Sequence, residues 1–180
     1  PHLVPKHQLP LPGCLLMGAI ERLSMLTRRR IVLRQRKWRR CPPQRRLAIA
    51  FVRNARGFHA MAWTEDDRVG AQSAYHSAIA IELAFKAYLL HRGFSDDWTR
   101  VWLRHDLSKA LRCVRMLGFQ GVPDGIAELA AVLSPLYVFG ALRSGVKPDL
   151  PLPPDTADQA ICELLGAVEA AIGIDSGTDR

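Results

Sequence analysis

The chain has 180 residues, of which 48% are hydrophobic and 23% are charged, and its formal net charge at pH 7 is +8. This length suits one domain with its own hydrophobic core, since such a domain buries roughly 70% of its unfolded surface. The composition excludes a disordered or fibrous protein. Because prolines and a glycine interrupt the apolar run Leu9–Ile20, no membrane span is expected either.

The positive charge is concentrated near the amino terminus. The segment Arg28–Arg46 holds ten Lys and Arg residues and no acidic residue, whereas residues 47–180 carry a net charge of −3. Basic blocks of this kind often bind anionic partners, because Lys and Arg release counterions when they meet phosphates. We predict that residues 1–46 form a Pro- and Arg-rich extension, which is either a flexible arm for nucleic acid or a segment foreign to the native protein.

From residue 47 onward the apolar pattern is helical. The first predicted helix has its inward face at Leu47, Ala50, Phe51, Ala55, Phe58 and Ala62. The second, from about residue 67 to residue 92, is apolar around most of its circumference and is therefore expected to be central. A predicted loop at 94–103 carries Trp98 and Trp102, which could stack a base or close one end of the fold.

Three further helices are predicted in the second half of the chain. Asp106 caps the first of them, which ends at Gly118. The next begins near Pro123 and is broken or restarted at Pro135. Asp155 caps the last, which ends at Gly173. No segment alternates as a strand would, so the expected fold is all-α: an up-and-down bundle of four to five helices over residues 47–173, followed by a disordered tail at 174–180.

The four cysteines are widely spaced and are expected to be reduced thiols. Cys113 and Cys162 fall within apolar helical patterns, where a free cysteine behaves as a small hydrophobic residue. No His or Cys spacing suits zinc, so neither a metal nor a cofactor is expected. The main basic block follows the first apolar run instead of preceding it, which does not fit a secretory signal, and a cytoplasmic protein is predicted.

Two motifs stand in order along the chain. Glu82 and Lys86 are four residues apart in an otherwise apolar helix, where they can pair, and His105-Asp106-Leu107 follows after the tryptophan-containing segment. The arrangement A-x-E-x-x-x-K-A-x-L, then H-D-L-x-x-x-L, then a glycine resembles the HEPN superfamily. These are small all-helical domains of prokaryotic toxin, defence and nucleotidyltransferase-associated proteins, and the resemblance covers residues 47–173.

The resemblance implies a bundle that often forms homodimers and associates with nucleotides or RNA, here as part of a toxin–antitoxin or defence system. It also leads us to expect Glu82, Lys86, His105 and Asp106 as neighbours near one end of the bundle. Active HEPN ribonucleases carry an Arg followed four to six residues later by a His on a late helix that faces a dimer cleft, and they need no metal. The late helices of this chain contain Arg143 but no His.

The Arg-to-His spacing of active HEPN ribonucleases occurs at two other places in this chain. Arg53 and His59 would point to different faces of the first helix. Arg100 and His105 precede the third helix, where His105 could transfer protons and Arg100 could stabilise a phosphorane. His105 could equally cap or pack against a helix.

We therefore predict a nucleotide- or RNA-binding module rather than an enzyme. Its phosphate contacts would come from Arg104, Lys109, Arg112 and Arg115, together with the amino-terminal arm. Two alternatives are open: a metal-independent endoribonuclease that uses Arg100 and His105, and a protein-interaction or neutralising subunit that docks onto an operon-encoded partner.

Overall fold

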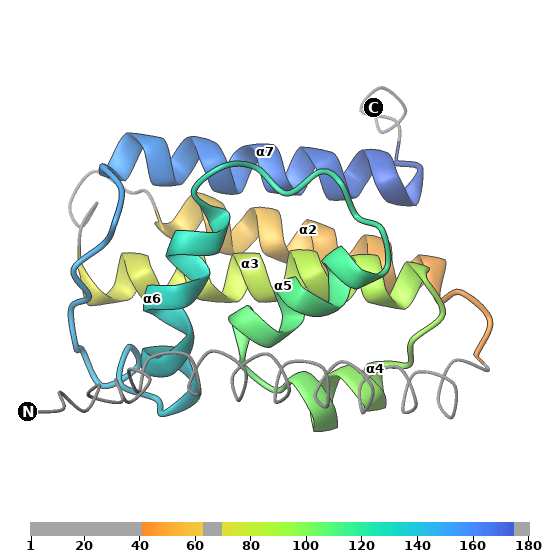
Figure 1. The fold of residues 1–180 in the computed structure, drawn as a ribbon, viewed down its shortest axis with the longest axis horizontal. Coiled ribbons are helices and arrows are strands. Elements are labelled where there is room, and N and C mark those ends of the chain that lie inside the picture. Colours follow the sequence, from red (N-terminus) through yellow and green to blue (C-terminus); the bar gives the residue numbers. More distant parts are fainter. Residues whose placement is uncertain (1–40, 63–69, 175–180) are drawn as a thin grey trace, which may run out of the picture. The chain divides into compact units, whose positions relative to one another are not determined.

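The computed structural model describes residues 41–62 and 70–174, and all regular elements in these ranges are helices (Figure 1). In chain order they are α2 (Arg45–Ala62), α3 (Ala71–His91), α4 (Asp96–Trp98), the π-helical turn η1 (Thr99–Leu103), α5 (Leu107–Met116), α6 (Ile126–Val138) and α7 (Pro154–Ile172). The predicted all-α class is confirmed for this part of the chain. Most of the predicted basic extension, residues 1–40, and the predicted tail from residue 175 lie outside the described residues.

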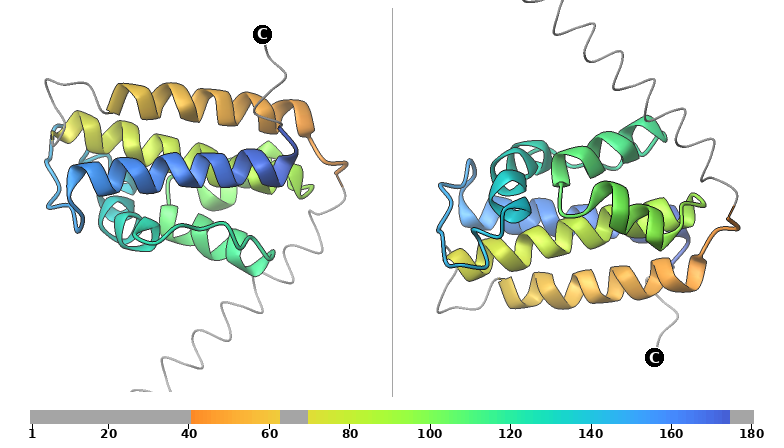
Figure 2. Two further views of the ribbon diagram at one scale, coloured as in Figure 1. Left: turned by 90° about the horizontal axis from the view of Figure 1, so that it is seen from above. Right: turned by 90° about the horizontal axis from the view of Figure 1, so that it is seen from below.

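The helix α3 is the centre of the bundle, as its apolar sequence predicts. It packs against α2, α5, α6 and α7, and its largest fully buried side chains are Ile81, Phe85, Leu89 and Leu90. Figures 1 and 2 show α2, α3 and α7 lying alongside one another, whereas α6 crosses α3. A helix that is apolar around most of its circumference needs neighbours on most of its sides.

Polar contacts fasten α2 to α7. The guanidinium of Arg56 donates from Nε and Nη2 to the two carboxylate oxygens of Glu169, at 3.0 and 2.7 Å. One turn further along α2, Nε2 of His59 lies 2.7 Å from Oδ1 of Asp158. The two-pronged Arg56 contact fixes the direction as well as the distance between the helices, because both oxygens are engaged.

The predicted inward face of the first helix is partly wrong. Ala55 and Ala62 are buried as expected, but the other buried residues of α2 are Ala48 and Val52, and Ala50 is exposed. Leu47, Phe51 and Phe58 lie at the half-buried borders of the face. The side chains at its centre are small, so the backbone of α2 can approach its neighbours closely.

The predicted loop at 94–103 is also wrong, because α4 and η1 occupy most of it. The Ser95 side chain accepts a hydrogen bond from the backbone N–H of Trp98 at 3.1 Å and so caps α4. Trp98 is buried with its ring 4.6 Å from that of Phe94. The Ser95 cap and the ring contact with Phe94 stabilise these helical turns, and burial leaves Trp98 unable to stack a base.

Two predicted helix boundaries differ from the structure. The helix α6 continues through Pro135 to Val138 instead of breaking there, although the proline nitrogen has no N–H to donate to the preceding turn. Pro153 occupies the position before α7, and Pro154 begins the helix, so Asp155 lies in the first turn and is not the cap. The predicted helix ends at Gly118 and Gly173 are confirmed, and both glycines have positive φ angles.

Within the described ranges, no helix combines the length and the apolar character that crossing a bilayer requires. The cysteines in these ranges are free thiols. Cys113 is buried as predicted, whereas Cys162 is exposed on α7 and lies 3.5 Å from Nη1 of Arg56. The prediction that Cys162 packs as a small hydrophobic residue is therefore wrong.

The two cysteines should differ in reactivity. Burial raises the pKa of the Cys113 thiol to about 11, and nearby Lys109 and Arg112 offset only part of that increase. Because the thiolate is the nucleophile, we expect iodoacetamide to alkylate Cys162 in the native protein and to reach Cys113 only after denaturation. Peptide mass spectrometry measures both sites in one sample. Equal rates at the two cysteines in the native protein would contradict the packing of α5 against α3.

Candidate functional site

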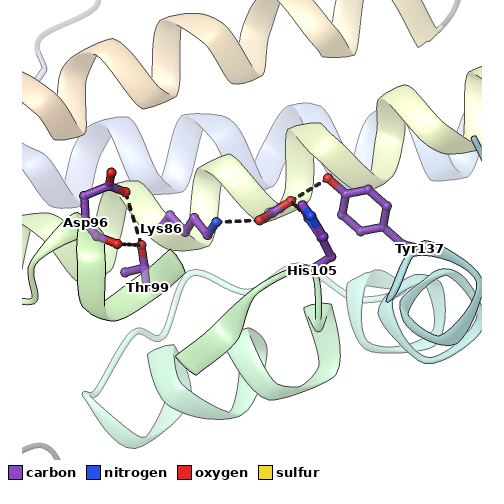
Figure 3. Close-up of polar contacts among 6 residues, drawn as sticks. Lys86, Asp96, Thr99, His105 and Tyr137 are labelled. Atoms are coloured by element: carbon purple, nitrogen blue, oxygen red, sulfur yellow. Dashed lines mark hydrogen bonds and ion pairs between the residues drawn. The ribbon is translucent and has the colours of Figure 1, made fainter. Parts of the chain in front are cut away.

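The carboxylate of Glu82 is the centre of a polar cluster inside the bundle. Glu82 is only 5% exposed, and its two oxygens meet three partners. Nζ of Lys86 lies 2.5 Å from Oε1, Nδ1 of His105 lies 3.1 Å from Oε2, and the hydroxyl of Tyr137 donates to Oε2 at 2.5 Å. Figure 3 shows Lys86, His105 and Tyr137 converging from three parts of the fold.

Each partner reaches Glu82 for an identifiable reason. Lys86 follows it by four residues on α3, so the two side chains are neighbours on one face of the helix. Tyr137 lies on the buried face of α6, four residues after the buried Leu133, so its hydroxyl needs an internal partner. Burial and the adjacent Glu82 carboxylate raise the pKa of the Tyr137 hydroxyl. It therefore remains a hydrogen-bond donor at neutral pH.

A tight turn places His105. The backbone N–H of Asp106 donates to the carbonyl of Leu103 at 3.1 Å, and Arg104 between them adopts φ 52° and ψ −124°. Among the described residues, Arg104 is the only non-glycine residue with a positive φ. This backbone conformation favours glycine, and for another residue it costs on the order of 1–3 kcal/mol. Strain of this kind is concentrated at functional sites.

The residue after His105 anchors the turn to two helices. Oδ1 of Asp106 accepts the backbone N–H of Lys109 at 2.9 Å, which confirms the predicted cap of α5. The same oxygen accepts the hydroxyl of Ser134, on α6, at 3.1 Å. His105 thus lies between a strained residue and a capping residue, and the orientation of its backbone is set by both α5 and α6.

A pocket of about 310 Å³ opens beside this cluster. Its lining consists of Lys86, Arg100, Arg104, His105 and Val138. Asp97 accepts a hydrogen bond from Arg100 at 2.9 Å, but both side chains are largely exposed, so the pair is weak. The side chain of Arg104 has no partner among the described residues. Three cationic side chains and an imidazole at one opening favour an anionic ligand.

The structure brings together some of the predicted site residues and separates others. Glu82, Lys86 and His105 are in contact as expected, and Asp106 adjoins them, although Glu82 lies near the middle of α3 and not at one end of the bundle. Arg100 and Arg104 share the pocket with His105. Tyr137 was not foreseen as a site residue. The only signal in the sequence is its spacing of four residues from Leu133, which places it on the apolar face of α6.

The predicted phosphate contacts on α5 lie apart from this pocket. Arg112 and Arg115 are exposed on α5, and neither lines the pocket. Lys109 is half-buried, and its Nζ donates to the carbonyl of Trp102. That contact ties α5 to η1, so the structure gives Lys109 a role in holding the fold.

No group of three or more His, Cys, Asp or Glu side chains within residues 41–62 and 70–174 is arranged to hold a metal ion. Comparisons of the chain with protein-family models, with curated proteins and with solved structures find no match. The residue motifs alone carry the HEPN resemblance.

Replacement of Arg104 by glycine tests whether the backbone at this position is strained. Arg104→Gly removes the strain, so we expect the free energy of unfolding to rise by about 1 kcal/mol after the entropic cost of glycine is subtracted. Urea denaturation measures this change. The matched variant Arg100→Gly, in helical backbone, should instead lower stability. A loss of stability in Arg104→Gly as large as that in Arg100→Gly would contradict the assigned turn.

Proposed function

We propose that this chain is a HEPN-like helical module that binds phosphate groups of a nucleotide or RNA in the pocket beside Glu82. The observation that supports this most strongly is the convergence of Lys86, Arg100, Arg104 and His105 on one opening. Residues 47–180 carry a net charge of −3, so this local excess of positive charge does not follow from the composition of the helical region. The two ordered motifs support a role in a toxin–antitoxin or defence system.

The cluster behind the pocket prepares it for an anion. Lys86 is 12% exposed and is held by Glu82, yet an ammonium group has three N–H donors and one contact leaves others available. Because an ionised Glu82 accepts hydrogen bonds and does not donate them, the proton of a neutral His105 lies on Nδ1. Nε2 is then an acceptor, which suits a ribose hydroxyl of the ligand, while the phosphate oxygens are left to the cationic side chains.

The volume of the pocket limits the size of the ligand that it can hold. A volume of about 310 Å³ lies at the lower end of the usual range for small-molecule sites, roughly 300–1,000 Å³. It suits a phosphate with part of its sugar better than a whole cofactor. Arg104 would pair with the phosphate through two N–H donors, as guanidinium groups commonly do. Arg112, Arg115 and the amino-terminal basic segment would contribute longer-range attraction.

Binding to the full chain tests the proposal. We expect adenosine monophosphate and short single-stranded RNA to bind in low salt, and the double variant Arg100→Ala/Arg104→Ala to weaken both by about tenfold or more, because each lost charge-assisted hydrogen bond is worth about 1.5–3 kcal/mol. Isothermal titration calorimetry measures the two affinities.

The control is Lys147→Ala, which removes an exposed positive charge that does not line the pocket and should leave both affinities within about twofold. Absence of binding to both ligands in low salt would refute the proposal. Unchanged affinity in the double arginine variant would also refute it, because the proposal places binding in this pocket.

One observation favours a second candidate, a metal-independent endoribonuclease: Arg100 and His105 share the pocket, and Glu82 supports the imidazole at 3.1 Å. In this reaction Nε2 of His105 takes the proton of a ribose 2′-hydroxyl and O2′ attacks the phosphorus. The bond to the 5′-oxygen breaks, and that oxygen takes a proton from water. Arg100 would stabilise the charge on the phosphorane.

Cleavage assays distinguish the two candidates. The ribonuclease requires RNA cleavage that persists in chelator and disappears in His105→Ala, whereas the binding module requires no cleavage by either protein. The third candidate, a protein-interaction or neutralising subunit that docks onto an operon-encoded partner, would use exposed apolar residues such as Val101, which is 54% exposed on η1.

A further inference from the structure

A second pocket, of about 480 Å³, lies beside the amino-terminal part of α3. Its polar lining comes from Gln72, Tyr75 and His76 on α3 and from Arg143 after α6. Neither predicted motif includes these residues. Gln72 and Arg143 are exposed, and their side chains have no partner among the described residues. Nδ1 of His76 is buried and has no hydrogen-bond partner in the structure.

The exposed side chains of Gln72 and Arg143 are available to pair with a ligand in this cavity. Arg143 supplies a planar cation suited to phosphate. Gln72 and His76 supply donors and acceptors suited to the edge of a base or to a sugar hydroxyl. The combination matches one nucleotide unit.

The two pockets are neighbours on the same side of α3. Gln72, Tyr75, Glu82 and Lys86 fall within a sector of about 80° when successive residues are placed 100° apart. Tyr137 stands between the pockets, with its ring 5.9 Å from that of Tyr75 and 4.7 Å from that of His105. The rings of Tyr75 and His105, one in each pocket, are therefore separated by no more than the sum of these two distances.

The segment after Tyr137 also connects the two pockets. Val138 lines the pocket beside Glu82, whereas Leu142 and Arg143 line the second pocket. Between them in the chain lies Phe139, whose side chain is 85% exposed, the most exposed large hydrophobic residue among those described. An exposed aromatic ring adjacent in sequence to a residue that lines a cationic pocket could stack a base of a bound single strand.

We propose that the second pocket binds the adjoining nucleotide of a single-stranded oligonucleotide whose phosphate occupies the pocket beside Glu82. Arg143 pairs with the further phosphate, Gln72 and His76 contact its base or sugar, and Phe139 stacks a base between the two pockets. This assignment rests on the proposed function and extends it, because it names a single strand longer than one nucleotide as the preferred ligand.

Affinities of the full chain for uridine monophosphate and for a uridine tetranucleotide test the assignment. We expect Arg143→Ala and Phe139→Ala each to weaken tetranucleotide binding by about tenfold, the scale of one lost stacking or phosphate contact, and to leave mononucleotide binding unchanged. Matched controls are Lys147→Ala for the charge and Met61→Ala for the exposed apolar surface. Neither residue lines a pocket described above, and neither variant should change either affinity.

The outcomes separate this inference from the proposed function. If Arg100→Ala/Arg104→Ala weakens both ligands but Arg143→Ala and Phe139→Ala weaken neither, the second pocket is overturned and the first stands. If the double arginine variant changes nothing, the proposed function fails first. Light scattering covers a remaining possibility: if Phe139→Ala dissociates a dimer and leaves tetranucleotide affinity unchanged, Phe139 is a subunit contact and its stacking role is overturned.

Discussion

One buried carboxylate sets the arrangement of one side of this bundle. Glu82 holds Lys86 on its own helix, His105 in the turn before α5 and Tyr137 near the end of α6. A buried ion whose partner is removed costs about 3–5 kcal/mol, so these segments are expected to assemble together around it. Because an unpaired Glu82 would be unfavourable, the arrangement that pairs it is preferred. In that arrangement Lys86 and His105 lie at the edge of one pocket.

The strained turn at Arg104 supports the same cluster, because it places His105 against Glu82. The backbone at that position would be most stable as glycine, yet an arginine stands there and its side chain lines the pocket. The capping contacts of Asp106 hold the turn against this strain. Tyr137 has a double role, because its hydroxyl completes the Glu82 cluster while its ring separates two cationic pockets. Together these features give a pocket whose cationic lining is held in place by contacts within the protein.

Contacts within one helix could be predicted from the sequence, and contacts between distant segments could not. The four-residue spacing of Glu82 and Lys86 indicates their pairing, and Asp106 before an apolar run indicates its cap. Ser95 before Asp96 and Asp97 is a local capping signal for α4, whereas burial of Trp98 depends on packing that no local pattern reveals. Similarly, Tyr137 meets Glu82 across 55 residues of chain, and the positive φ of Arg104 follows from the turn that connects η1 to α5.

The protonation of His105 tests the central claim most directly. If an ionised Glu82 holds this ring, a neutral His105 must carry its proton on Nδ1, with Nε2 free as an acceptor. Nitrogen-15 NMR correlations of the labelled full chain distinguish the two ring nitrogens, and the other histidines serve as internal references. The account predicts the Nδ1–H tautomer for His105 and its loss in Glu82→Ala, which removes the acceptor. Observation of the Nε2–H tautomer in the unmodified protein would contradict it.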